Sequence, residues 1–321
     1  MLPEKRLSDA AFLGLLGAAL LIATILFFTI NTRGNWDFVL PLRGKKWLLL
    51  LTVAYAVGVS TLLFQTLTHN PILTPSLLGF DSLYVLLQTA LVFALGSTGF
   101  VMLGAVGQFA LAAPLMITAA FGLFTVLTRQ AHDDLARLVL VGVIFGVLFR
   151  SINSLLQRLI DPNQFAVAQT GYFAQFTTVN TTLLIIGMLV MSMSFFGIWR
   201  LCRRLDILML GRETAIGLGV DYRRDSRIIL LWVTVLVSVA TALVGPVSFF
   251  GLLVCAMVNA LSPHIHHRLR LPAAVLIAAV ILVLGQTIFE QVLGMKAVLG
   301  VVIEFLGGLV FLWLVLRRRK I

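Results

Sequence analysis

Residues 181–200, TTLLIIGMLVMSMSFFGIWR, form a continuous apolar run, and residues 201–227, LCRRLDILMLGRETAIGLGVDYRRDSR, form the longest polar interruption of the chain. An apolar run of about 20 residues crosses the roughly 30 Å hydrocarbon core of a bilayer as an α-helix. The polar stretch holds six arginines and a short helix-like segment ended by Gly217 and Gly219. An oily helix followed by a basic loop is the pattern of a polytopic membrane protein.

The composition of the whole chain agrees with this pattern. Of its 321 residues, 60% are hydrophobic and 12% are charged, whereas soluble domains are about half apolar and about a quarter charged. The apolar runs are continuous, while lipid-facing strands would alternate, so helices are favoured over a barrel. We therefore predict an all-α polytopic membrane protein with one transmembrane domain over residues 1–321.

Hydropathy predicts about ten transmembrane helices. They are expected near residues 10–30, 47–67, 80–95, 99–127, 136–157, 181–200, 228–244, 250–263, 271–291 and 298–316. The first run is interpreted as a retained helix and not as a signal peptide, because it is long and no small-residue cleavage site follows it. Glycine pairs such as Gly142 and Gly146 let helices approach closely in lipid.

The net charge of +11 is explained by topology and gives no reason to expect nucleic acid. An even number of helices puts both termini on one side of the membrane. If that side is the cytoplasm, the cytoplasmic segments collect most of the 24 basic residues. The loops assigned to it lie near 67–80, 128–137, 200–227 and 264–270.

The sequence gives no reason to expect a metal or another cofactor. Cys202 and Cys255 are far apart and belong to no CxxC motif. His264, His266 and His267 are close together, but no cysteine or carboxylate accompanies them in sequence, so an ordinary basic loop is expected. The chain also lacks a GxxxxGK[ST] phosphate loop and is predicted to have no ATPase or other enzymatic activity of its own.

Four segments in order resemble the permease subunits of binding-protein-dependent ABC importers for ferric siderophores and cobalamin, the iron-chelate uptake permease family. They are GVSTLLFQTLTHNPILTPSLLG at 58–79, LMLGRETAIGLGV at 208–220, GPVSFFGLLV at 245–254 and LGVVIEFLGGLVFLWLVLRRR at 299–319. The sequence departs from the family after Gly-Leu, where a Pro-His pair and an arginine are usual. Cys255, Ala256 and Asn259 stand at those places.

The resemblance implies that the polar stretch contains a coupling helix, between transmembrane helices six and seven, that docks on a dimer of cytoplasmic ATP-binding subunits. The residues expected to carry this role are Leu210, Gly211, Arg212, Glu213, Ala215, Leu218 and Gly219. A rigid plug of this kind converts closure of the ATPase into rotation of membrane helices. The alternative from the residues alone is a solvated basic loop.

Basic residues on the predicted outer face imply a second partner, a periplasmic or extracellular substrate-binding protein. The expected set of exposed cations is Arg43, Lys45, Lys46 and Lys296. In the family, basic residues near Lys46 and Lys296 meet carboxylates of the binding protein. Such exposed pairs steer encounter and fix register more than they add affinity. Anchoring at lipid headgroups by snorkelling is the alternative.

The resemblance places the translocation path between two permease subunits, either two copies of this chain or this chain and a different permease. Neutral hydrogen-bonding residues suited to such a path are Gln65, Asn70, Gln108, Asn153 and Gln157. Arg150, Glu290 and Glu304 are ions in or near predicted helices, which makes them functional candidates. Pairing, snorkelling or an interfacial position would equally account for Arg150 and Glu290.

The function implied is import of an iron(III)–siderophore complex across the bacterial cytoplasmic (inner) membrane, with both termini in the cytoplasm. Cobalamin or haem as the substrate of the same kind of importer stays open. An ion-coupled secondary transporter would need buried acids on broken helices in symmetric halves, and only Glu304 qualifies. A membrane enzyme would need an acidic metal motif, and the only acidic pair is Asp133-Asp134.

Overall fold

The computed structural model describes residues 8–31, 36–130, 135–169, 171–291 and 299–318. Throughout these ranges the chain forms helices and connecting segments and no strand, which confirms the all-α prediction. The helices are α1 (Asp9–Thr29), α2 (Trp36–Thr68), η1 (Pro75–Leu78), α3 (Phe80–Met102), α4 (Gly104–Gln130), α5 (Leu135–Leu159), α6 (Pro162–Gln169), α7 (Thr181–Leu208), α8 (Arg212–Gly217), α9 (Tyr222–Val244), α10 (Phe250–Leu261), α11 (His267–Gln291) and α12 (Leu299–Arg318).

Each of the ten predicted membrane segments corresponds to a helix, but the number of membrane spans is not settled at ten. Eight of the described helices are long and apolar enough to cross a bilayer, namely α1, α2, α3, α4, α5, α7, α9 and α11. α10 and the apolar part of α12, Leu299–Leu309, are shorter.

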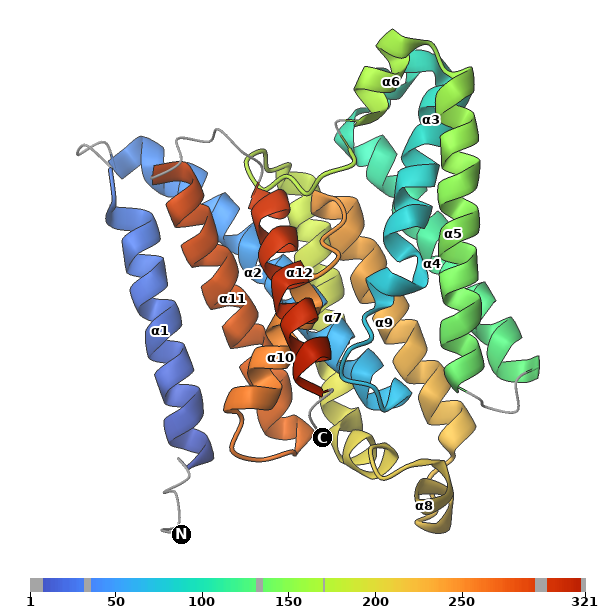
Figure 1. The fold of residues 1–321 in the computed structure, drawn as a ribbon. Coiled ribbons are helices and arrows are strands. Elements are labelled where there is room, and N and C mark those ends of the chain that lie inside the picture. The colour runs from blue at the N-terminus through green and yellow to red at the C-terminus, as the bar shows by residue number, and fades with distance from the viewer. Residues whose placement is uncertain (1–7, 32–35, 131–134, 170, 292–298, 319–321) are drawn as a thin grey trace.

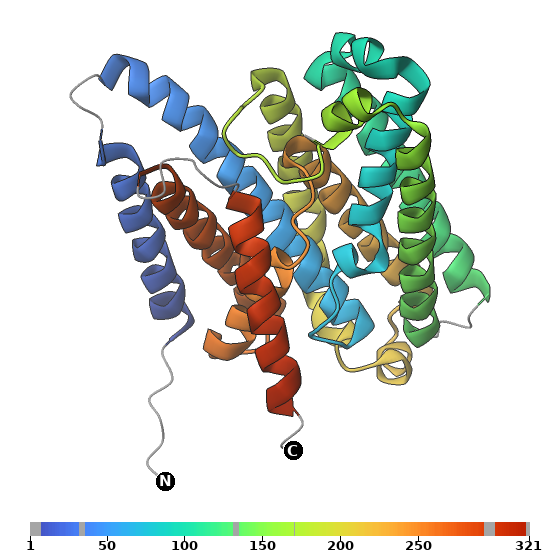
Figure 2. The same cartoon turned by 45° about the horizontal axis from the view of Figure 1, so that its top comes forward.

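The long helices form one bundle around α2 (Figure 1). α2 packs against α7, α9, α10 and α11, and in Figure 2 it runs diagonally through the middle of the bundle in light blue. α1 covers the outer side of α11, and α3, α4, α5 and α6 form a group at the opposite edge. Leu50 and Phe64 of α2 are completely buried in the apolar core.

The polar stretch at 201–227 is mostly helical, which the hydropathy pattern did not predict. α7 continues through it to Leu208, and α9 begins at Tyr222, where the Asp221 side chain accepts a hydrogen bond from the backbone N–H of Arg224. α8 lies between them. The beginning of α1, the end of α12 and α8 all lie at the same end of the bundle (Figure 1).

α3 and α10 each follow an irregular segment. The turn after α2 is held by Gln65 Nε2, which donates to the carbonyl of Pro71 at 2.7 Å, and by Asn70 Oδ1, which accepts from the N–H of Ile72 at 3.0 Å. The segment before α10 is linked to the start of α3, because Ser248 Oγ donates a hydrogen bond to Asp81 Oδ2.

Candidate functional site

The segment Leu210–Gly219, called the coupling segment below, is a compact helical turn at one end of the bundle. Gly211 precedes α8 with φ +97°, and Gly219 follows it with φ +80°, a backbone region that glycine adopts without strain. The N–H of Val220 donates to the carbonyl of Ala215 at 3.0 Å and closes the turn. Ala215 is completely buried, so one side of α8 is fixed against α7 and α9.

The other side of the coupling segment exposes apolar side chains. Leu210, Ile216 and Leu218 are 57%, 53% and 59% exposed. Figure 1 shows α8 projecting from the end of the bundle. An apolar group beside the charged Arg212 and Glu213 is suited to a groove on another protein, where it would be buried. Ile216 is not among the residues predicted for this role, although it lies in the same contiguous segment, between Ala215 and Gly217.

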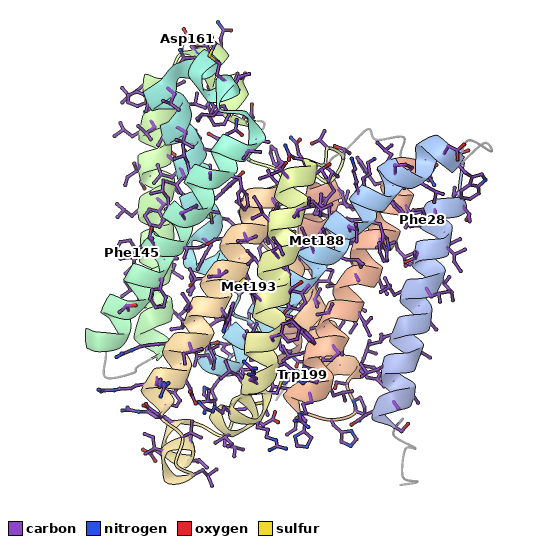
Figure 3. All side chains as sticks on the ribbon, turned by 180° about the vertical axis from the view of Figure 1, so that it is seen from behind. Phe28, Phe145, Asp161, Met188, Met193 and Trp199 are labelled. Atoms are coloured by element: carbon purple, nitrogen blue, oxygen red, sulfur yellow. The ribbon has the colours of Figure 1, made fainter. Side chains whose placement is uncertain are left out.

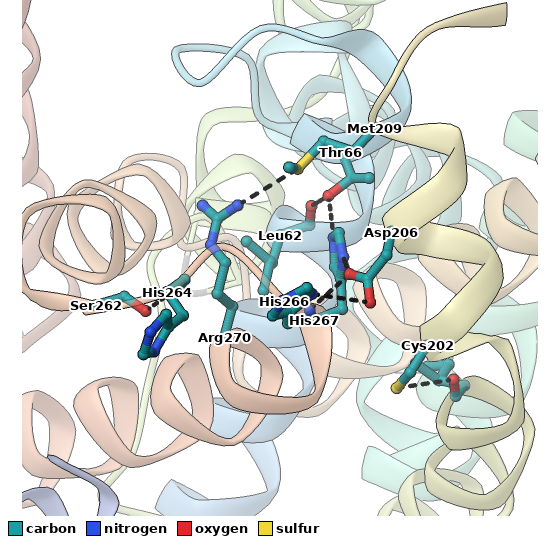
Figure 4. Close-up of polar contacts among 11 residues, drawn as sticks. Leu62, Thr66, Cys202, Asp206, Met209, Ser262, His264, His266, His267 and Arg270 are labelled. Carbon is teal, nitrogen blue, oxygen red and sulfur yellow. Dashed lines mark hydrogen bonds and ion pairs between the residues drawn. The ribbon is translucent and has the colours of Figure 1, made fainter. Parts of the chain in front are cut away.

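A buried polar cluster joins the end of α7 to α11 and α2, just before the coupling segment (Figure 4). His267 Nδ1 lies 2.6 Å from Asp206 Oδ1, and the N–H of His267 donates to the same oxygen at 2.8 Å. His267 Nε2 lies 2.7 Å from Thr66 Oγ1. His267 is completely buried, and both of its ring nitrogens have a partner.

The expectation of an ordinary basic loop is therefore wrong for His267, because the fold brings a carboxylate to it. Asp206 reaches His267 from a different helix, at a sequence separation of 61 residues, so no local pattern reveals it. His264 pairs with Asp9 at 2.6 Å, and His266 lies 3.7 Å from Asp206. In the described part of the chain, no group of three or more His, Cys, Asp or Glu residues is arranged to hold a metal ion.

Further contacts fix the end of α7. His69 Nε2 lies 3.0 Å from the carbonyl oxygen of Leu208, so the residue after α2 touches the last residue of α7. Arg270 of α11 donates to Asn259 Oδ1 on α10 and also contacts the sulfur of Met209. The end of α7 thus contacts α2 and α11, and the same arginine connects it to α10.

A cavity of about 470 Å³ lies beside this cluster. Gln65, Asn70, Asn259 and Arg270 are its main polar lining residues. Gln65 is buried, and its Oε1 has no hydrogen-bond partner among the described residues. Two of the predicted path residues, Gln65 and Asn70, therefore meet at one cavity.

The other predicted path residues lie elsewhere. Gln108 lines a different cavity of about 230 Å³ and donates to the carbonyl of Phe100 at 3.1 Å. Gln157 donates to the hydroxyl of Tyr172 at 3.2 Å, and Asn153 is buried on α5. The five residues thus do not form one continuous lining within this single chain.

The expectation of a set of exposed cations is wrong for Arg43 and Lys46. Arg43 is buried and donates to the carbonyls of Phe27 and Phe28 at 2.6 and 3.1 Å. Lys46 Nζ lies 2.6 Å from Glu290 Oε1, and the two side chains are 11% and 10% exposed. A charge withdrawn from water needs hydrogen-bond or ion-pair partners, which two backbone carbonyls supply to Arg43 and Glu290 supplies to Lys46.

Lys45 is exposed, as expected. Lys296 lies outside the described residues. Of the other candidate ions, Arg150 donates to Ser82 Oγ on α3 at 3.2 Å, and Glu304 is half-buried on α12. Glu290 is accounted for by its pair with Lys46 and by a hydrogen bond from Gln286 at 2.8 Å.

Comparison with known proteins identifies the chain. The FecCD transport family matches residues 7–317. The petrobactin import system permease protein YclO of Bacillus subtilis (strain 168) is 39% identical over 301 residues, which cover 94% of this chain and 96% of that protein. The hemin transport system permease protein HmuU of Yersinia pestis is 31% identical, with 95% and 91% covered.

The fold also matches that of a solved structure, a metal-chelate type ABC transporter in an inward-facing conformation. The TM-score is 0.79 at 21% identity, with 96% of this chain and 99% of that chain covered. Fold and sequence together define a polytopic α-helical permease. The chain belongs to the FecCD transport family, which confirms the resemblance found in the four sequence segments.

Proposed function

We propose that this chain is a membrane-spanning permease subunit of an ABC importer for an iron(III)–siderophore complex. The observation that carries the proposal is the 39% identity to a petrobactin import permease over almost the whole of both chains. A second petrobactin import permease, FatC of Bacillus anthracis, is 31% identical over 85% of this chain. A cobalamin import permease of Halobacterium salinarum is 26% identical, so cobalamin is a weaker candidate, and haem is the other.

The coupling segment is proposed to dock on a dimer of ATP-binding subunits. Its support is the exposed apolar group Leu210, Ile216 and Leu218 on a turn whose other side is fixed by the buried Ala215. The α8 end of the bundle then faces the cytoplasm, with both termini, and the chain forms one transmembrane domain of the bacterial inner membrane. A substrate-binding protein is proposed to dock at the opposite end, where Lys45 is exposed.

The buried cluster gives the coupling segment a mechanical connection to the path. A push on the coupling segment moves the end of α7, and the contacts of Asp206 with His267 and of His267 with Thr66 pass this displacement to α2. Gln65, in the last turn of α2, lines the 470 Å³ cavity. Removing one partner of a buried pair costs about 3–5 kcal/mol of stability. The Asp206–His267 contact is therefore expected to stay formed while the coupling segment is displaced.

The path is proposed to run between this chain and a second permease subunit, with the Gln65–Asn70 cavity on it. Its amides, Gln65, Asn70 and Asn259, offer neutral hydrogen bonds to a passing chelate, and Arg270 is the cationic group in the same lining.

Transport assays with the complete importer in proteoliposomes test the proposal. The permease is reconstituted with its ATP-binding subunit and binding protein, and uptake of ferric petrobactin, haem and cobalamin is compared. ATP-dependent, vanadate-sensitive uptake of the ferric siderophore is expected. Uptake driven by a proton gradient without the ATPase would overturn the importer class. Uptake of haem or cobalamin alone would overturn only the substrate.

A further inference from the structure

An apolar groove of about 280 Å³ lies between α7 and α11, with α2 as its floor. Its lining consists of Tyr55, Val59, Phe195, Ile198, Trp199, Leu271, Pro272, Val275 and Leu276. The rings of Phe195 and Trp199 are stacked with their centroids 5.6 Å apart, and both remain partly exposed. In Figure 3, Trp199 lies on the part of α7 that faces α11. The groove is therefore open to whatever surrounds the single chain.

The proline in α11 contributes to this groove. Pro272 has no N–H, so the carbonyl of Arg268 lacks the donor that a regular helix would supply. The compact proline ring also occupies less of the space between the helices than a long side chain would. The proline at position 272 therefore contributes to the open space of the groove.

Two arginines lie one helical turn beyond the residues that line the groove. Arg203 follows Trp199 by one helical turn on α7, and Arg268 precedes Leu271 by one turn on α11. The two helices run in opposite directions, so both arginines lie at the α8 end. Arg268 also lies within electrostatic range of Cys202, the neighbour of Arg203.

These arginines differ from their neighbour Arg204, whose guanidinium lies 2.8 Å from Asp225. Arg203 and Arg268 are exposed, and neither forms an ion pair with any residue in the described ranges. A ligand of this site therefore needs an apolar part for the groove and an anionic part for the two exposed arginines.

We propose that this groove binds an anionic phospholipid. An acyl chain fills the apolar part between α7 and α11, and the phosphate lies between Arg203 and Arg268. Arginine matches the geometry of phosphate oxygens, and basic pockets between transmembrane helices on the cytoplasmic side bind anionic headgroups. A free phosphate would leave the apolar groove unfilled, and a lipid without net charge would leave the arginine pair unbalanced.

The bound lipid joins the same two helices as the buried cluster. Arg203 is one turn before Asp206 on α7, and Arg268 is adjacent to His267 on α11. A phosphate between the arginines therefore clamps α7 to α11 on the outside, while Asp206 and His267 do so inside. This assignment rests on the groove and the arginines and does not depend on the identity of the transported substrate.

Native mass spectrometry of the purified chain with phosphatidylglycerol or phosphatidylcholine tests the site. The wild type is expected to retain phosphatidylglycerol preferentially, and the variant R203Q/R268Q to lose this preference. Each arginine accounts for roughly a five-fold change in affinity. The control R227Q removes an exposed arginine of α9 and is expected to retain the lipid. L276W fills the groove with the arginines intact and is expected to displace the lipid.

A thermal-shift measurement provides an independent readout. Phosphatidylglycerol is expected to raise the Tm of the wild type and of R227Q, but not of R203Q/R268Q. Equal retention of both lipids by the wild type would mean ordinary annular contact and would overturn the proposal. So would unchanged phosphatidylglycerol retention in R203Q/R268Q, an equal rise in Tm with inorganic phosphate alone, or disulfide crosslinking of W199C between two copies of the chain.

Discussion

Gly79 and Gly146 bring the start of α3 and the middle of α5 into backbone contact. A Cβ atom added at Gly79 would lie 2.6 Å from the Cα atom of Gly146, which is closer than real Cβ atoms approach. Gly79 also has φ +95°, a backbone conformation that residues other than glycine rarely adopt. The glycine pair on α5 predicts close packing at Gly146. The partner at this contact is Gly79, in the irregular segment that precedes α3.

Replacing Gly79 with valine is expected to destabilise the bundle. The left-handed backbone costs roughly 1–2 kcal/mol and the steric overlap roughly 1–3 kcal/mol more. A lower Tm and a smaller monodisperse fraction in detergent are the expected results. The matched control is Gly14→Val on α1, where nothing lies within 4 Å of an added Cβ. An equal loss in both variants would show that the contact with Gly146 is not the cause.

The coupling segment gives a prediction about ATPase binding. Ile216→Asp places a charge in the exposed apolar group and is expected to weaken association with the ATP-binding subunits by at least ~2 kcal/mol, as for a buried interface anchor. Co-purification of the ATPase and ATP-driven uptake measure the effect. Ile265→Asp is the control, because Ile265 is also exposed but lies outside the coupling segment. Normal ATPase binding by the Ile216 variant would exclude this surface.

Two further changes address the conformation and charge of the same segment. Gly219→Val strains a residue with φ +80° although space is available around it, and Arg212→Glu reverses a charge on α8. Both variants are expected to insert normally and to hydrolyse ATP without proportional uptake. The ratio of substrate transported to ATP hydrolysed measures this uncoupling. If the ratio is unchanged in both, the segment has no part in coupling.

The sequence predicts the class of fold because its apolar runs are long and continuous. It is less informative at the ends of helices. The hydropathy pattern predicts that α7 ends near residue 200 and that α2 begins near residue 47, whereas charged turns extend both helices. Helical hydrogen bonds continue into the interface region, where polar side chains are solvated, and hydropathy does not detect this continuation.

The candidate site is predicted only where a motif is local. The coupling segment is contiguous, so the sequence can predict it, and its docking role stays a prediction. The partners of His267 and Lys46 come from helices far away in sequence, Asp206 on α7 and Glu290 on α11, so neither pair has a local signal. A charge with no opposite charge nearby in sequence predicts exposure, whereas the tertiary structure buries His267 and Lys46 with their partners.

The buried cluster gives a prediction that separates coupling from stability. Asp206→Asn keeps the shape of the side chain but removes its charge, and it leaves His267 buried with a weaker partner. A loss of about 3 kcal/mol of stability is expected, as for a broken buried pair, together with a lower ratio of uptake to ATP hydrolysis. A double-mutant cycle with His267→Gln is expected to be strongly non-additive.

The control for this cycle is Asp9→Asn. Asp9 pairs with His264 at the same distance of 2.6 Å, but both side chains are exposed. Exposed pairs contribute about 0–1 kcal/mol, so this variant is expected to resemble the wild type. Asp206→Asn with wild-type stability and coupling would contradict the proposed connection between the coupling segment and α2.

The two adjacent lysines of α2 are expected to act differently. Lys46→Met leaves Glu290 buried without its cation and is expected to destabilise the protein by about 3 kcal/mol, and Lys46→Met/Glu290→Leu is expected to restore most of this loss. Lys45 is exposed, so Lys45→Glu is expected to leave the Tm unchanged and to slow association with the substrate-binding protein. Thermal unfolding measures the loss of stability. The rate of association with the substrate-binding protein, at low and at high salt, measures the effect of Lys45, because added salt screens only the exposed charge effectively. Slower docking for Lys46→Met/Glu290→Leu at wild-type Tm would instead place Lys46 in the docking surface.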